Sequence, residues 1–141
     1  MRGIGSEFAY KKYIQSKKEE ITASEILESL KIPQSSKQRA EEYIKKASNS
    51  KAQIIVFPED FITGPIETRR ELADKNNIYR KRFQSLAKKF KLDIIPGSII
   101  EKDNKGLHNT TYYIDSSGKI KARYRKVNLW LPERRYLTPG H

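Results

Sequence analysis

Cysteine is absent from the 141 residues of this sequence. Disulfide bonds, thiolate metal ligands and a cysteine nucleophile are therefore excluded within these residues. Long apolar runs are absent too: no stretch approaches the roughly 18 residues that a membrane-spanning helix needs, and no secretory signal pattern is present. We expect a cytoplasmic protein with no membrane partner, and the lack of cysteine is compatible with that compartment.

Acidic residues are scarce, with 17 Asp and Glu against 29 Lys and Arg, so that the net charge is +12 and the isoelectric point is near 9.8. Such a balance suggests nucleic acid as a partner. However, the cations are spread over the whole length, and no short Lys/Arg cluster alternates with aromatic residues in a recognisable binding motif. A lysine-rich solvated surface explains the same charge, so we do not expect nucleic acid to be the partner.

Three segments are expected along the chain. Residues 1–8, MRGIGSEF, read as a vector-derived leader, because Gly-Ser and Glu-Phe are common translations of cloning sites. Residues 9–35 are expected to form an N-terminal helical segment without an assigned role; Thr22 and Glu25 make a capping box there, and Pro33 ends the helix. Residues 36–141 are long enough for one ordinary domain with its own core.

Two apolar stripes at helical spacing predict helices in this domain. The first helix is expected at about 37–49, and its apolar residues are Ala40, Tyr43, Ile44 and Ala47. The second is expected at about 69–91, where Thr68 and Glu71 form a capping box at its start. Its apolar side consists of Leu72, Tyr79, Phe83, Leu86 and Phe90.

Four strands are expected, at about 52–58, 93–101, 107–115 and 119–126. The first contains the apolar run IIVF, too short for a buried helix, which predicts a parallel strand covered on both faces. Pro96-Gly97 within the second strand indicates an edge or a bulge, and Ser116-Ser117-Gly118 joins the last two strands as a hairpin. The order helix, strand, helix, strand, strand, strand predicts a layered α/β fold.

Two charged residues stand out because of their positions. Glu59 follows the first buried strand, after Pro58, at the carboxyl end where open α/β sheets bind ligands; the alternative is a carboxylate that caps a loop or pairs with a surface cation. Lys126 breaks the alternation of cations and apolar residues from 119 to 125, so its ammonium would face the apolar side and require a carboxylate. If instead the strand ends at Arg125, Lys126 is simply solvated.

The stretches IIVFPEDFITG, GLHNTTYYIDSSGKIKARYRKVNLW and PERRYLTPG together resemble the nitrilase, or carbon–nitrogen hydrolase, superfamily. That family's pattern is an apolar strand ending in F/L-P-E, an N-T/A strand, a D-x-x-G-K hairpin, a Y-R-K-x-x-L segment and a closing E-R-x-x-x-x-x-G. The resemblance covers about 36–140 and implies half of a four-layer α-β-β-α sandwich, a partial carbon–nitrogen hydrolase domain.

The resemblance also implies roles for three residues. Glu59 matches the family's general base, Lys126 its catalytic lysine, and Glu133 a second carboxylate that orients the substrate and supports the lysine. In the family's mechanism, a cysteine thiolate attacks an amide, carbamoyl or nitrile carbon, with no cofactor and no metal. The implied partner is a small-molecule amide or carbamoyl substrate, and we expect a homo-oligomer.

The sequence departs from the family in one important respect. The family's cysteine lies a few tens of residues beyond the E-R-x-x-x-x-x-G segment, whereas the sequence runs only to His141. Ser98 lies in no G-x-S-x-G elbow, and His108 is expected to be packed or hydrogen-bonded, so neither replaces the cysteine. We therefore expect the 141-residue chain to be inactive alone. The alternatives are a non-catalytic nitrilase-like interaction module and a basic nucleic-acid-binding protein.

Overall fold

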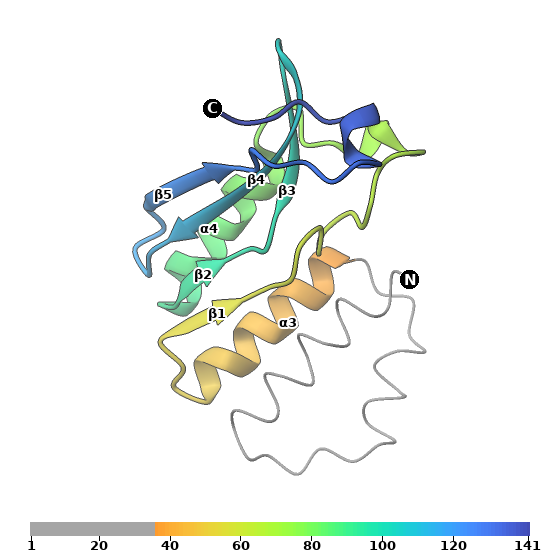
Figure 1. The fold of residues 1–141 in the computed structure, drawn as a ribbon. Coiled ribbons are helices and arrows are strands. Elements are labelled where there is room, and N and C mark those ends of the chain that lie inside the picture. Colours follow the sequence, from red (N-terminus) through yellow and green to blue (C-terminus); the bar gives the residue numbers. More distant parts are fainter. Residues whose placement is uncertain (1–35) are drawn as a thin grey trace.

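The computed structural model describes residues 36–141 (Figure 1). The expected leader at 1–8 and the expected helical segment at 9–35 lie outside the described residues. None of the helices that the structure describes is long and apolar enough to cross a membrane.

A five-stranded mixed sheet forms the centre of the domain. Its strands are β1 (Ile54–Val56), β2 (Asp93–Ile95), β3 (Ile99–Asp103), β4 (Gly106–Ile114) and β5 (Ile120–Arg125). β1 and β2 are parallel, and β4 runs antiparallel to β2, β3 and β5. The long strand β4 has β5 on one side and both β2 and β3 on the other. The expected strand at 93–101 is therefore two short strands that share one neighbour.

The break between β2 and β3 occurs at Pro96-Gly97, where the sequence analysis expected an edge or a bulge. Gly97 has a left-handed φ of +77°, and a Cβ atom added there would lie 1.8 Å from the carbonyl oxygen of Pro58. Only glycine permits this close approach of two backbones. The break therefore lets the backbone that leaves β1, at Phe57 and Pro58, lie in close contact with the β2–β3 connection.

Two helices, α3 (Ser36–Asn49) and α4 (Ile78–Phe90), pack against one face of the sheet (Figure 1). Ile55, Ile94 and Ile114 lie side by side on that face, because Ile55 pairs with Ile94 and Ile94 pairs with Ile114. The helices contribute the buried side chains Ala40, Ile44, Ala47, Phe83, Leu86 and Ala87. Each large apolar side chain buried in this way stabilises the fold by about 1.5–3 kcal/mol.

The start of α4 corrects the sequence-based expectation. The helix begins at Ile78 and not near residue 69, and a single 3₁₀ turn, η1 (Arg70–Leu72), occupies the expected first turn. The Asp74 carboxylate accepts the N–H groups of Ile78 at 2.7 Å and Tyr79 at 2.9 Å, and so caps the helix. Asp74 is itself held by backbone hydrogen bonds with Ile100 and Lys102, long-range pairing that outweighs the local capping box.

The other face of the sheet corrects a second expectation. The first strand was predicted to be covered on both faces, yet Ile54 is 42% and Val56 is 58% exposed. Tyr124, which pairs with Thr111 and lies on the same face, is 56% exposed. Within the described residues the domain thus has two layers, helices over a sheet, as expected for half of an α-β-β-α sandwich.

Candidate active site

Glu59 lies in the turn that follows β1, and its neighbour Asp60 fixes the shape of that turn. Asp60 has a left-handed φ of +52°. Its backbone N–H donates to Ser98 Oγ at 2.9 Å, and Ser98 Oγ donates back to Asp60 Oδ1 at 3.1 Å. Because Ser98 follows the glycine at the β2–β3 break, that break anchors the turn. The Glu59 side chain itself is 56% exposed, so its carboxylate is accessible to solvent.

Lys126 follows β5 directly. The strand ends at Arg125, as one of the two sequence alternatives proposed, but the backbone N–H of Lys126 still donates to the carbonyl of Asn109 on β4 at 2.8 Å. The side chain is 29% exposed and is not simply solvated. Its ammonium lies 3.1 Å from Glu59 Oε1, which joins two residues that are far apart in the sequence.

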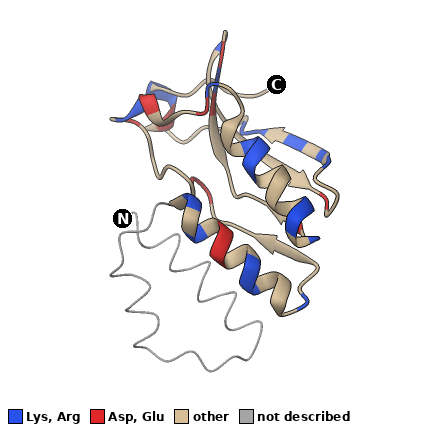
Figure 2. Cartoon of the chain, turned by 180° about the vertical axis from the view of Figure 1, so that it is seen from behind, with Lys and Arg blue, Asp and Glu red and all other residues tan. Residues whose placement is uncertain are grey.

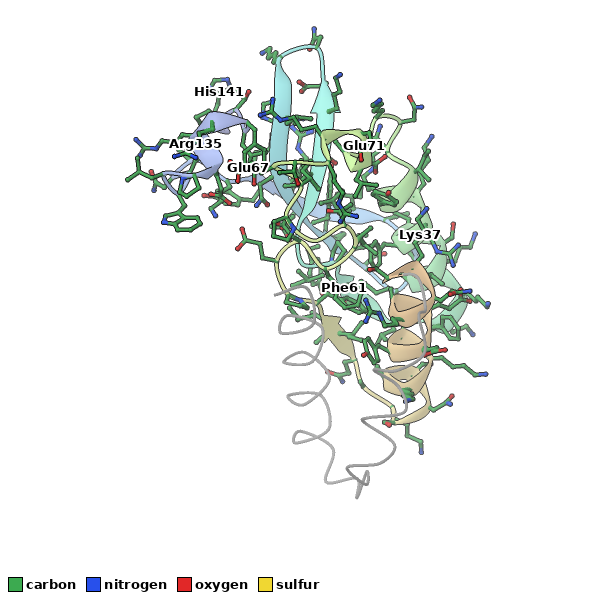
Figure 3. All side chains as sticks on the ribbon, turned by 90° about the vertical axis from the view of Figure 1, so that its right-hand side faces the viewer. Lys37, Phe61, Glu67, Glu71, Arg135 and His141 are labelled. Carbon is green, nitrogen blue, oxygen red and sulfur yellow. The ribbon has the colours of Figure 1, made fainter. Side chains whose placement is uncertain are left out.

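Glu133 approaches the same ammonium from the other side. It begins the 3₁₀ turn η2 (Glu133–Arg135), and its Oε1 and Oε2 lie 3.0 Å and 2.9 Å from Lys126 Nζ. Oε2 also accepts the backbone N–H of Trp130 at 2.8 Å, and the residue is only 8% exposed. Arg135 and Glu67, which are labelled in Figure 3, lie 3.9 Å apart and link η2 to the loop after β1.

The electrostatics of the cluster favour a charged lysine. Burial alone lowers the pKa of the Lys126 ammonium, but its hydrogen bonds to Glu133 and Glu59 outweigh that effect and hold the pKa above its usual value. The ammonium is therefore protonated at neutral pH. A fixed positive charge of this kind stabilises an oxyanion that forms beside it.

Asp60, which lies close to Glu59 and Lys126, has a pKa that the fold clearly changes. Burial, first, and the negative charge of Glu59, second, raise the pKa of Asp60 to about 6. The hydrogen bond from Ser98 acts in the opposite direction. Sequence reasoning gave Asp60 no role, because its partial burial results from the β2–β3 break and is not visible in the local pattern.

Asn109 on β4 is the second residue that sequence reasoning missed. It is 4% exposed, and its Nδ2 donates to Glu59 Oε1 at 2.9 Å. A signal was present, since asparagine is depleted in strand interiors and a buried amide needs hydrogen-bond partners. The site therefore gathers Glu59, Asn109, Lys126 and Glu133 from four separate segments.

His108, next to Asn109, is not part of this cluster. Its ring is 2% exposed, and its nitrogen atoms lie 3.1 Å from the Thr138 carbonyl and 3.1 Å from Asp103 Oδ1. This is the packed, hydrogen-bonded histidine that the sequence analysis expected. Within residues 36–141, no group of three or more His, Asp or Glu side chains is placed to hold a metal ion.

A second polar network holds the end of β5 just before Lys126. Arg125 lies 2.9 Å from Asp103 and 3.7 Å from Glu101, and the hydroxyl of Tyr112 donates to the same Glu101 carboxylate. Glu101 is 4% exposed, whereas the side chains of Arg125 and Asp103 are 22% and 31% exposed, so the network is buried at Glu101 and partly open at Asp103. These contacts fix the backbone from which the Lys126 side chain extends.

Comparison with known proteins shows the family. The family model described as carbon-nitrogen hydrolase matches residues 34–141. The chain belongs to the carbon-nitrogen hydrolase family. This carbon-nitrogen hydrolase domain is 33% identical to a 2-oxoglutaramate amidase of Bacillus subtilis over 112 residues, which covers 77% of this chain and 43% of that protein. It is also 33% identical to a nitrilase of Pyrococcus abyssi over 116 residues, which covers 77% of this chain and 43% of that protein.

Solved structures agree with this assignment. Nit3 of Saccharomyces cerevisiae, a nitrilase-superfamily member, superposes with a TM-score of 0.66 at 28% identity and covers 75% of this chain and 42% of that one. An amidase from Nesterenkonia has a TM-score of 0.65 over 78% of this chain and 44% of that one; at 22% identity it supports the fold alone. The chain spans less than half of the length of the curated relatives described above.

The cations of the carbon-nitrogen hydrolase domain lie along several elements (Figure 2). Lys81, Arg82, Lys88 and Lys89 belong to α4, and Lys121, Arg123 and Arg125 belong to β5. Some of them are paired: Arg82 and Lys89 both contact Glu41 on α3, at 3.0 Å and 2.9 Å. The positive charge is therefore distributed over the surface and partly neutralised by ion pairs between helices.

Proposed function

We propose that the domain supplies the general base and the lysine of an amidase-type carbon–nitrogen hydrolase. Glu59 is the base, Lys126 is the cation that stabilises the oxyanion, and Glu133 supports and orients the lysine. The observation that carries this proposal is the position of Lys126 Nζ, 3.1 Å from Glu59 and 2.9 Å from Glu133. Such a cluster adds little to stability, since desolvation offsets attraction, so chemistry is the better explanation of it.

The nucleophile in this proposal is a cysteine from outside these 141 residues. Glu59 accepts the thiol proton, and the thiolate attacks the carbonyl carbon, so that a C–S bond forms and the oxygen becomes negative beside Lys126. When the intermediate collapses, the C–N bond breaks, Glu59 returns the proton to nitrogen, and ammonia or an amine leaves. Water, deprotonated by Glu59, then cleaves the thioester to give a carboxylic acid and the free thiol.

The geometry suits these steps in two respects. Glu59 is exposed enough to reach a substrate and a water molecule, whereas Glu133 is buried and serves to fix the ammonium. The substrate class is an amide or carbamoyl compound, which is supported by the relatives named 2-oxoglutaramate amidase and omega-amidase. A nitrile is the alternative, supported by the relative named nitrilase. We further propose a cytoplasmic homo-oligomer.

The sequence that follows His141 in the gene tests this proposal first. A cysteine at a strand-to-helix turn is expected there, and an open reading frame without one would remove the enzymatic function. In the full-length protein, Glu59→Gln and Lys126→Met are expected to abolish ammonia release from small amides. The 141-residue chain by itself is expected to release none. Ammonia release by that chain above a Glu59→Ala control would contradict the requirement for a cysteine from outside these residues. It would also contradict the roles assigned to Glu59 and Lys126.

A further inference from the structure

We propose that Asn109 is a positioning residue that sets the orientation of Glu59 relative to Lys126. Its side-chain Nδ2 donates to Glu59 Oε1 at 2.9 Å, and its backbone carbonyl accepts the N–H of Lys126 at 2.8 Å. One buried residue on β4 thus contacts both the base and the lysine. The catalytic meaning of this arrangement rests on the proposed function, but the arrangement itself can be tested separately.

Glu59 is the member of the cluster that needs such a residue. Glu133 is nearly buried and is fixed by the Trp130 N–H in addition to its ion pair. Glu59 is 56% exposed, and an exposed ion pair alone restrains a long side chain weakly. The amide of Asn109 is buried, directional and held by its strand, so it supplies the restraint that the ion pair lacks.

Both donors also meet at the same carboxylate oxygen. Asn109 Nδ2 and Lys126 Nζ both donate to Oε1 of Glu59, at 2.9 Å and 3.1 Å. The direction of the carboxylate is thus set by two donors from neighbouring strand segments, and Asn109 is the one of the two that is buried.

NMR titration of Lys126 Nζ in the 141-residue chain tests the inference. Three carboxyl groups influence that ammonium, namely Glu59, Glu133 and Asp60. We expect Glu59→Ala to lower the pKa of Lys126, and Asn109→Ala to produce at least half of the same shift, because the pair loosens. Asn109→Ala added to Glu59→Ala is expected to cause no further shift.

The controls separate positioning from a merely structural role. Asn128→Ala, the same substitution at an exposed asparagine nearby, is expected to leave the Lys126 titration unchanged. Asn109→Leu fills the site without a donor and is expected to behave like Asn109→Ala. If the Asn109 variants lose stability but keep the Lys126 titration of the unmodified chain, the positioning role is wrong.

A measurement that needs no change at Asn109 completes the test. In the unmodified chain, one Nδ2 proton of Asn109 is expected to be shifted and slow to exchange, and Glu59→Ala is expected to remove both properties. If the Asn109 amide signals are unchanged in Glu59→Ala, the inference about Asn109 is wrong, but the proposed function is not affected. If Glu59→Ala leaves the Lys126 titration unchanged, the ion pair itself is absent, and the proposed function fails with it.

Discussion

Lys126 makes two ion pairs that differ in their surroundings. The pair with Glu59 is half open to solvent, whereas Glu133 is only 8% exposed and is also bonded to the Trp130 N–H. Exposed pairs contribute about 0–1 kcal/mol. Removing one partner of a buried, hydrogen-bonded group is more costly, because it leaves the other groups unsatisfied. The two carboxylates should therefore differ in their effect on stability.

The same substitution at both positions tests this difference. Glu59→Gln is expected to change the free energy of unfolding by less than about 1 kcal/mol. Glu133→Gln is expected to lower it by about 1–3 kcal/mol, because its new amide faces the Lys126 ammonium and the buried side chain at this position has little access to water. Urea unfolding of the two variants and of the unmodified chain measures both values. Equal losses would contradict the asymmetric environment of the lysine.

Asp60 makes a prediction about pH. Its pKa is 3.8 when unperturbed and about 6 in the folded chain. Between these values the unfolded chain ionises Asp60 while the folded chain keeps the proton, so stability decreases as the pH rises through this window. Asp60→Asn removes the titration, and asparagine tolerates the positive φ. The free energy of unfolding of this variant, minus that of the unmodified chain, is expected to increase from about pH 4 to pH 6 and then stay constant. A difference that does not change with pH would contradict the raised pKa of Asp60.

At the scale of single elements, the first helix and the last two strands were the most predictable parts of the fold. The bounds expected for the last two strands, 107–115 and 119–126, agree with those of β4 and β5 to within one residue. The reason is that the turn residues of a hairpin are recognisable in the local sequence. The start of α4 was wrong by nine residues, since its cap, Asp74, is held by β3, far away in the sequence. The spacing of residues in the sequence predicts turns and apolar faces of helices. It does not predict which distant segments pair with one another.

The same limit applies to the candidate site. Glu59 and Lys126 were conspicuous because each breaks a local pattern, an apolar run or an alternation. Asp60 breaks no local pattern, and Asn109 gave only the signal of an amide within a strand. The importance of both residues comes from their contacts with Ser98 and Glu59. Such contacts depend on the path of the backbone at the β2–β3 break, which no local spacing specifies.

The corrected helix start gives a prediction of its own. Asp74→Ala is expected to lower the free energy of unfolding by about 0.5–2 kcal/mol, because the N–H groups of Ile78 and Tyr79 lose their acceptor. Thr68→Ala, at the cap that the sequence pattern suggested, is expected to have almost no effect, since Thr68 is exposed and lies outside α4. Thermal or urea unfolding of both variants decides between the two caps. A larger loss for Thr68→Ala would restore the earlier start.

At the scale of the whole described domain, several large apolar side chains are exposed. Ile54, Val56 and Tyr124 lie on the sheet face away from the helices and are 42%, 58% and 56% exposed. Trp130 and Leu131, close to Glu133 in the sequence, are 69% and 74% exposed. Large apolar side chains exposed in this number are typical of a surface that another layer covers. In the α-β-β-α sandwich that the family resemblance implies, that layer is a second sheet.

This surface predicts association of the 141-residue chain. In sedimentation experiments, the average mass is expected to increase with concentration, because pairing of two sheet faces removes apolar area from water. Val56→Gln is expected to shift the equilibrium toward the monomer. Ile78→Gln is the matched control, because Ile78 is 57% exposed against 58% for Val56 but lies at the start of α4. An equal effect of both substitutions would show that general hydrophobicity, and not the sheet face, drives association.

A strictly monomeric chain with a sharp, concentration-independent thermal transition and no binding of hydrophobic dye would show that this sheet face is stable without a covering layer.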